Sequence, residues 1–337
     1  MKTRINQLPG RAMAWLGVLA LAAAVSGCGG GGGESGTAPA VADARNGDYT
    51  VFAANTQQYA LSLDFDAKTY HLKGAGTDDT GSFSASGSNF QFTPAGTAPA
   101  VNNATFSQFG DTVAGGLRIG AKVVPFIASR SFVTTMGEAE GQYKFLTTIV
   151  DTAAPANNNI FTGEIVAGTF RQCNDLTIYT IATCPAASVR TAVVTNDGPD
   201  FTADFGAIGK ITFRIAKVGT EKIFLRASQS AGTSRRFWIG LNQSATFSDV
   251  AGAGVNSESQ GTTTNVTTAA LTSTQRTETN VQTARNGPAV ATLVPGLLGI
   301  NTAADGLFFA MRSADMVFVF AGLDNLVHPG YVEIGKR

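Results

Sequence analysis

The feature that most constrains the fold is a series of short segments in which apolar and polar residues alternate. In the stretch YALSLDFDAKTYHLKG, Tyr59, Leu61 and Leu63 share one face of an extended strand, because successive side chains point to opposite sides. Residues 66–68 turn the chain, and Tyr70 resumes the pattern on a return strand. The same alternation recurs in SFSASG, NFQFTP, KITFRIAKV, KIFLRAS, RRFWIGL and MVFVFAG. We therefore expect an all-β fold.

Three pairs of similar short sequences indicate an internal duplication of about 95 residues. GDYTVF and GQYKFL start 94 residues apart, the arginines of LRIGAKV and FRIAKV are separated by 96, and FIASR and FLRAS start 98 apart. Chance similarity among β-rich segments is the alternative. We expect tandem antiparallel β modules, either barrels or sandwiches, with at most a short helix at residues 135–140.

The N-terminal residues follow the plan of a secretory signal peptide. Residues 1–11 carry three basic residues and no acidic one, and a hydrophobic run covers residues 12–24. This run is shorter than the ~20 apolar residues of a permanent membrane span. The sequence VSGC at residues 25–28 then resembles the lipobox of bacterial lipoproteins.

The lipobox resemblance implies a lipid anchor. In that class Cys28 would receive a diacylglyceryl group, a peptidase would cut after Gly27, and the new amino group would be acylated. Gly29 stands where the inner-membrane retention signal has Asp, which favours the outer membrane of a Gram-negative-type bacterium. The expected location is the cell envelope, with the lipid bilayer as partner and the protein facing the periplasm or the cell surface.

These features divide the chain into five expected parts. Residues 1–27 are the signal peptide, 28–44 the lipidated cysteine with a Gly-rich flexible tether, 45–138 the first β module, and 139–243 the second. Residues 244–337 form a C-terminal β segment that could merge with the second module. Its opening threonine-rich tract predicts either solvated strands or an O-glycosylated stalk.

The two remaining cysteines, Cys173 and Cys184, predict a disulfide in an oxidising compartment. Closing a loop of this length would contribute ~2–3 kcal/mol. Two buried free thiols are the alternative. A zinc site has no support, because no CxxC occurs and neither histidine lies near the pair.

Motifs for catalysis or for metal and cofactor binding are absent. The sequence has no G-x-S-x-G elbow, no HExxH and no phosphate loop. His71 and His328 stand alone, so we expect structural or surface roles for both. Asp64 and Asp66 read as turn residues, with a calcium site as the alternative. We expect no enzyme activity, no metal and no cofactor.

One segment, SRRFWIGL, is a candidate for recognition. It places Arg235 and Arg236 beside Trp238, and these side chains can bind an anion or stack on a sugar. The alternative is that alternation puts one of the two neighbouring rings in a core. We treat Arg235, Arg236 and Trp238 as a candidate surface-recognition group.

Charge excludes one class of partner. Only 14% of residues are charged, with 24 basic and 24 acidic, and no basic run tracks nucleic-acid phosphates. The leading hypothesis is a non-catalytic binding or structural envelope lipoprotein, whose partner is an envelope protein or a glycan. A β-barrel carrier of a lipid or small apolar ligand is the first alternative. An extracytoplasmic hydrolase is the second.

Overall fold

The strands of the chain form three successive antiparallel meanders. The computed structural model describes residues 41–96, 104–120, 122–151, 157–175, 177–228, 234–243, 256–258, 268–271, 275–279, 287–303, 305–322 and 325–336. Apart from Val41, all of these belong to one unit, Ala42–Arg337.

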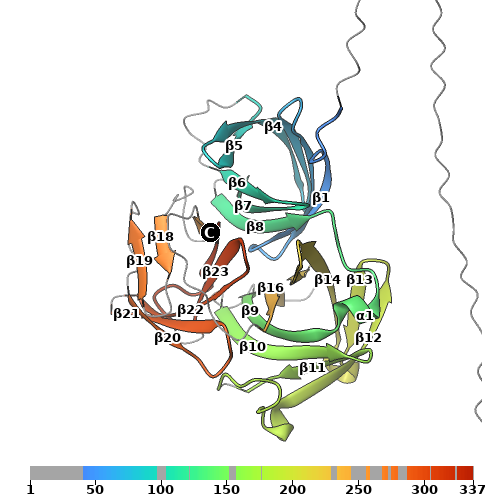
Figure 1. Ribbon diagram of the computed structural model, residues 1–337, viewed down its shortest axis with the longest axis vertical. Coiled ribbons are helices and arrows are strands. Elements are labelled where there is room, and N and C mark those ends of the chain that lie inside the picture. Colours follow the sequence, from blue (N-terminus) through green and yellow to red (C-terminus); the bar gives the residue numbers. More distant parts are fainter. Residues whose placement is uncertain are drawn as a thin grey trace, which may run out of the picture. The chain divides into compact units, whose positions relative to one another are not determined.

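The first meander is a closed eight-stranded barrel, here called barrel 1 (Figure 1). Each strand pairs with the next, and the last returns to the first through the pair Val51↔Ala128. Closure removes both sheet edges. The strands are β1 (Gly47–Ala53), β2 (Gln58–Asp64), β3 (Thr69–Gly74), β4 (Thr77–Ser86), β5 (Asn89–Pro94), β6 (Thr105–Phe109), β7 (Thr112–Ile119) and β8 (Lys122–Ser129).

A short helix, α1 (Met136–Ala139), leads into a second closed barrel, barrel 2. The short helix expected at residues 135–140 is confirmed, and Thr135 is its N-cap. Barrel 2 closes between its first and last strands. Its elements are β9 (Gly141–Asp151), β10 (Asn157–Val166), β11 (Thr169–Cys173), η2 (Ala186–Ser188), β12 (Val189–Asp197), β13 (Asp200–Asp204), η3 (Gly206–Ile208), β14 (Lys210–Val218), β15 (Glu221–Ala227) and β16 (Ser234–Asn242).

The third meander is an eight-stranded sheet in the order β17-β24-β23-β22-β21-β20-β19-β18. Its first strand pairs with its last, as in both barrels. Among the described residues, the first and second strands do not pair, so the sheet repeats the barrel order but is open there. The strands are β17 (Asn256–Glu258), β18 (Thr268–Leu271), β19 (Gln275–Thr279), β20 (Gly287–Ala291), β21 (Leu297–Thr302), β22 (Gly306–Arg312), β23 (Met316–Ala321) and β24 (Val332–Lys336).

The all-β prediction with tandem modules is therefore confirmed, and the modules are barrels rather than sandwiches. GDYTVF and GQYKFL begin β1 and β9, the first strands of the two barrels. Both segments contain a tyrosine whose hydroxyl donates to the carbonyl four residues earlier, Tyr49 to Arg45 at 2.8 Å and Tyr143 to Ala139 at 2.7 Å.

The other two sequence pairs lie on strands that are not equivalent. LRIGAKV starts on β7, the seventh strand of barrel 1, whereas FRIAKV lies on β14, the sixth of barrel 2. FIASR and FLRAS are likewise on an eighth and a seventh strand. The architecture repeats, but the later sequence similarity is one strand out of step.

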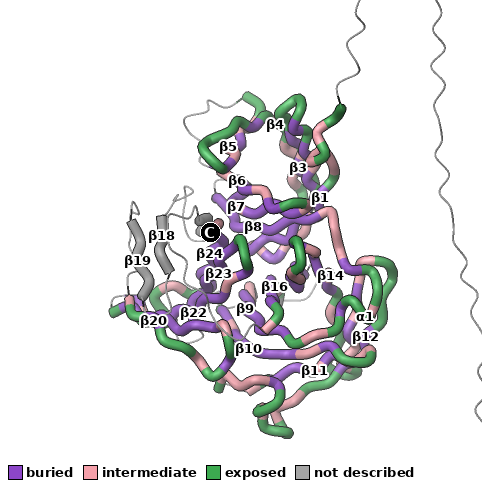
Figure 2. Tube along the Cα trace, viewed as in Figure 1, coloured by how far each residue is buried: buried purple, intermediate pink, exposed green. Residues whose placement is uncertain are grey.

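Each barrel has an aromatic interior. Buried positions follow the strands in Figure 2, since alternate side chains point inward. In barrel 1, Phe106 lies 4.5 Å from Phe92 and 5.0 Å from Phe90, measured between ring centroids. In barrel 2, Phe213 stacks on Phe224 at 4.1 Å. These rings fill the barrels as side chains fill other small barrels.

Candidate functional site

One end of barrel 2 holds a cavity of about 200 Å³. In an antiparallel meander the ends of odd-numbered strands meet the starts of even-numbered ones. Residues at the ends of β9, β11 and β15 therefore meet residues at the starts of β10, β12 and β16. The cavity is lined by Thr147, Asn159, Phe161, Gln172, Asn174, Arg190, Phe205, Ile208, Gly209, Lys210, Ile211, Arg226, Arg236 and Trp238.

The strand register arranges part of this lining as a continuous row. Arg226 on β15 pairs with Trp238 on β16, and Trp238 pairs with Thr147 on β9. Thr147 in turn pairs with Asn159 on β10. Across the barrel, Gln172 pairs with Arg190. Thr147 and Asn159 stand two residues from Phe145 and Phe161 on their strands. Side chains two residues apart share a face, so the row lies next to the aromatic interior on the inner face of the barrel.

Arg226 is the most buried cation of the site, with 8% of its surface exposed. Its guanidinium carbon lies 4.6 Å from the Trp238 ring centroid, a cation–π contact. Burial lowers the Arg226 pKa to about 10, and the positive charge of Arg236 contributes to the shift. Its side chain has no hydrogen bond or ion pair with any described residue.

Two further arginines face the same cavity. Burial and the charge of Arg190 lower the pKa of Arg236. Neither Arg190 nor Arg236 has an ion pair within the described residues, whereas Lys210 is bonded to Asp204 at 2.8 Å. The described lining contains no aspartate or glutamate. Three positive charges therefore converge without a counter-ion among the described residues: Arg226 is buried, Arg236 half-buried and Arg190 exposed. A buried charge without a partner is costly, and this applies most to Arg226.

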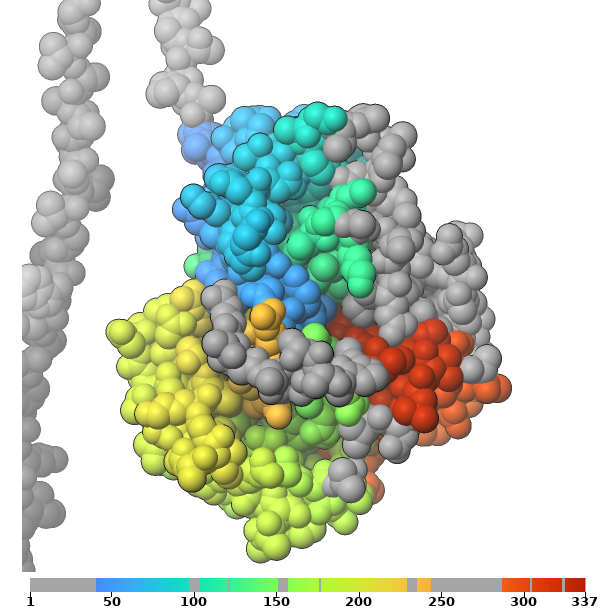
Figure 3. Space-filling view, turned by 180° about the vertical axis from the view of Figure 1, so that it is seen from behind, coloured from blue at the N-terminus to red at the C-terminus, as the bar shows by residue number. Residues whose placement is uncertain are grey.

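The mouth of the cavity has an apolar lip formed by Phe205, Ile208 and Ile211. Ile208 belongs to η3 and is 67% exposed, although its side chain is apolar. The segment, coloured yellow, lies at the surface in Figure 3. The Phe205 amide donates to the Gly209 carbonyl at 3.0 Å, which holds the turn that projects Ile208.

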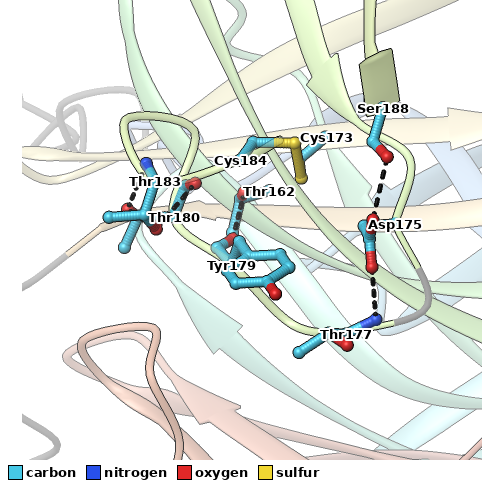
Figure 4. Close-up of a disulfide and its surroundings, with 9 residues drawn as sticks. All are labelled: Thr162, Cys173, Asp175, Thr177, Tyr179, Thr180, Thr183, Cys184 and Ser188. Atoms are coloured by element: carbon cyan, nitrogen blue, oxygen red, sulfur yellow. Dashed lines mark hydrogen bonds between the residues drawn. A yellow bond between two sulfur atoms is a disulfide. The ribbon is translucent and has the colours of Figure 1, made fainter. Parts of the chain in front are cut away.

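A disulfide constrains the β11–β12 connection, which forms part of the cavity wall. Cys173 and Cys184 are bonded, with a Cα–Cα distance of 5.8 Å, which confirms the predicted bridge (Figure 4). Asn174, the next residue, lines the cavity, and its amide donates to the Ser188 carbonyl at 2.8 Å. Asp175 accepts from the Ser188 hydroxyl at 2.8 Å. The bridge and these bonds order the β11–β12 connection beside the cavity.

The candidate recognition group divides between two sides of β16. Arg236 and Trp238 face the cavity, whereas Arg235 is exposed and does not line it. The expectation that Trp238 is a surface residue is wrong, because it is 3% exposed inside the barrel. The outward face of β16 is covered as well, since Phe237 stacks on Phe320 at 6.2 Å.

The sequence-based interpretation missed Gln172, Arg190 and Arg226. A signal for Arg226 was present, since Phe224 and Arg226 stand two residues apart on a strand and so share a face. A cation on the same strand face as an aromatic residue of the core is expected to point inward with it. Arg190 and Gln172 have no comparable local signal.

Both histidines are within hydrogen-bond distance of an aspartate carboxylate. His71 Nε2 lies 2.6 Å from Asp78 Oδ1 on exposed strands, and His328 Nε2 lies 2.8 Å from Asp305 Oδ1. Asp64 has a turn role, because its Oδ1 accepts from two amides of the following turn. In the ranges that the structure covers, no group of three metal-ligating side chains occurs.

The anchor and residues 28–40 of the tether lie outside the described residues. This applies to Cys28, to the signal peptide and to most of the threonine-rich tract. In the part of the chain that is described, no helix is both long and apolar enough to cross a membrane.

Comparisons with known proteins find likenesses among solved structures only. No family model matches the chain, and no curated protein matches it. A solved protein of unknown function from the DUF3598 family of Nostoc punctiforme PCC 73102 aligns with 86% of this chain and 93% of its own, at 10% identity and a TM-score of 0.20. The fold assignment rests on the strand pairing of the chain itself. Both barrels have the eight-stranded up-and-down architecture with which lipocalins and streptavidin hold one small ligand.

Proposed function

We propose that the protein is a non-catalytic binding protein whose second barrel holds a small anion. The observation that carries the proposal is the convergence of Arg190, Arg226 and Arg236 on one cavity without an acidic partner among the described residues. A bound anion would supply the missing negative charge, and arginine suits carboxylate and phosphate groups because its planar fork can bond both.

The chemistry of the lining supports binding rather than catalysis. Its described members include no histidine, carboxylate, cysteine or serine. Two members of nucleophilic type are already engaged, since the Thr147 hydroxyl donates to the Asn159 carbonyl at 3.0 Å and Lys210 pairs with Asp204. The cation–π contact and the buried position of Arg226 instead describe a pre-formed, polar end of a barrel. The cavity also favours an anion over a purely apolar ligand.

The proposed location is the cell envelope, with the chain held at the outer membrane by lipid on Cys28. Support comes from the lipobox resemblance of residues 25–28 and the glycines that follow. In that setting the protein would hold its ligand close to a membrane surface.

Trp238 provides a direct test. The chain from Glu34 onward keeps the whole unit Ala42–Arg337, and Trp238 is then its only tryptophan. Titration with inorganic phosphate, citrate or decyl phosphate is expected to change its fluorescence saturably. Arg226→Gln should weaken binding at least tenfold. Arg235→Gln, on the same strand but outside the lining, should leave it unchanged.

Two results would contradict this proposal. One is the absence of a saturable change with all three probes. The other is equal loss of affinity in Arg226→Gln and Arg235→Gln, which would indicate general surface charge rather than a site. Circular dichroism of both variants establishes that they are folded.

A further inference from the structure

We infer that the anion is amphipathic, with a head group of two or more negative charges in the barrel and an apolar chain that leaves over the lip of Phe205, Ile208 and Ile211. This inference rests on the proposed function and names the chemical class of its ligand.

The charge of the head group follows from the lining. Three arginines face the cavity without acidic partners in the described chain, and Lys210 is already neutralised by Asp204. A single carboxylate would balance one of the three charges. A phosphate monoester, which carries about −1.5 to −2 at pH 7, would balance most of two. The site therefore favours a multiply charged head.

The size of the cavity limits what can enter. Its volume of about 200 Å³ is below the ~300–1,000 Å³ typical of sites that enclose a drug-sized ligand. The aromatic interior beneath the row blocks deeper entry, since Phe161 itself lines the cavity and stacks on Phe145 at 4.6 Å. Only a head group fits, and any remaining part of the ligand must leave through the mouth.

The lip gives that remaining part an apolar path. Ile208 is 67% exposed at the edge of a cationic cavity, and Phe205 and Ile211 are half-buried beside it. The nearest charges of the lip, Lys210 and Asp204, neutralise each other. An alkyl chain crossing the lip would remove the exposed side chain of Ile208 from water, which is favourable.

This ligand chemistry has two possible sources. An alkyl phosphate can be a soluble molecule, or it can be the phosphate head group of a membrane lipid. Decyl phosphate in solution and vesicles that contain phosphatidic acid separate the two. Binding of the soluble probe alone identifies the first source, and transfer of lipid from vesicles to the protein identifies the second.

Trp238 fluorescence measures the effect of each part of the ligand. Decyl phosphate should bind at least tenfold more tightly than inorganic phosphate, and at least tenfold more tightly than decanoate, which carries one charge. Ile208→Ser should remove most of the affinity gained from the alkyl chain, so that the ratio of decyl phosphate affinity to inorganic phosphate affinity falls. Val193→Ser is the matched control, because Val193 is 66% exposed but lies outside the lining.

Each failure has its own signature. Equal affinity for inorganic and decyl phosphate, both sensitive to Arg226→Gln, would overturn the role of the lip and leave the proposed function standing. Equal affinity for decanoate and decyl phosphate would overturn the charge assignment of the head group. Failure of every probe to bind would overturn the proposed function as well.

Discussion

Both barrels place an arginine over an aromatic ring at one end, but only one of the two arginines has a counter-ion. Arg45 lies 4.3 Å from the Phe65 ring in barrel 1, and its Nε donates to Asp43 at 2.8 Å. These bonds lower the Asp43 pKa to about 2. Arg226 has the same stacking on Trp238 and no acidic partner in the described chain. The two stacked arginines therefore differ in one respect: the chain supplies a carboxylate to Arg45, and no described carboxylate bonds Arg226.

The interiors differ in the same sense. Phe106 of barrel 1 is surrounded by four other rings, at centroid distances of 4.5 to 6.4 Å. Barrel 2 has comparable packing around Phe224. The paired row beside it, however, contains three polar side chains, those of Arg226, Thr147 and Asn159. The packed rings around Phe106 are apolar, whereas the cavity of barrel 2 is lined by arginines and polar side chains.

The largest expected effect is on stability, and it compares a packed ring in the interior of barrel 1 with a ring that lines the cavity of barrel 2. Phe106→Ala should lower the free energy of unfolding by about 3–5 kcal/mol, because it leaves a cavity among packed rings. Phe205→Ala, at the half-exposed lip of barrel 2, should cost only about 1–2 kcal/mol. Urea denaturation followed by circular dichroism measures both. Equal losses would mean that the lip is packed as tightly as the barrel 1 interior.

A second test uses Lys144 to ask whether a buried cation outside the cavity lining of barrel 2 binds phosphate. Lys144 is buried, and burial lowers its pKa from 10.5 to about 8, partly opposed by Glu221. Unlike Arg226, Lys144 donates to backbone carbonyls, those of Asn242 at 3.4 Å and Pro295 at 3.3 Å. Between pH 8 and 10.5 the unfolded chain binds more protons at this residue, so stability should rise with pH by up to ~3 kcal/mol.

The measurement is the difference in unfolding free energy between the wild type and Lys144→Met at pH 7, 8.5 and 10. The unfolding free energy of the wild type should rise relative to that of the variant as pH rises. The contributions of the other titrating groups are the same in both proteins and cancel in the difference. Added phosphate should leave that difference unchanged. A difference independent of pH would show that Lys144 titrates normally.

A third change introduces a carboxylate into the cavity of barrel 2, as Asp43 provides one for Arg45 in barrel 1. Gln172→Glu introduces a carboxylate of nearly the same shape opposite Arg190 in the lining. Affinity for phosphate probes should fall at least tenfold, because an internal anion competes with the ligand. Stability without ligand should stay equal or increase. Unchanged affinity in this variant, measured by Trp238 fluorescence, would contradict the cationic cavity as the site.

The smallest effect is expected from the reverse change in barrel 1. Asp43→Asn removes the counter-ion of Arg45, whose side chain is 43% exposed. Exposed ion pairs contribute little, so the unfolding free energy should fall only slightly. Thermal denaturation at low and high salt is the measurement. A large loss would show that this pair organises barrel 1 in a way that its exposure does not suggest.

Several features could be predicted from the sequence because their physical cause is local. Strand alternation predicted the β fold, and the pair GDYTVF and GQYKFL marked equivalent first strands. The disulfide was predicted because two cysteines, Cys173 and Cys184, remain in an expected oxidising compartment. Alternation could not decide between barrel and sandwich, since both bury one face of every strand. Nor could it show that Trp238 is covered on the inside of a closed sheet.

The sequence by itself determined the strands and the bridge, and it placed Arg226 on the same strand face as Phe224 and Arg236 on the same face as Trp238. Only the tertiary structure decided that these two arginines meet Arg190, which is on β12, more than 30 residues from either along the chain. That meeting depends on the pairing of eight strands and on the closure of β16 onto β9. Register and closure are set by long-range packing, and no local pattern of residues encodes which strand ends will share one opening.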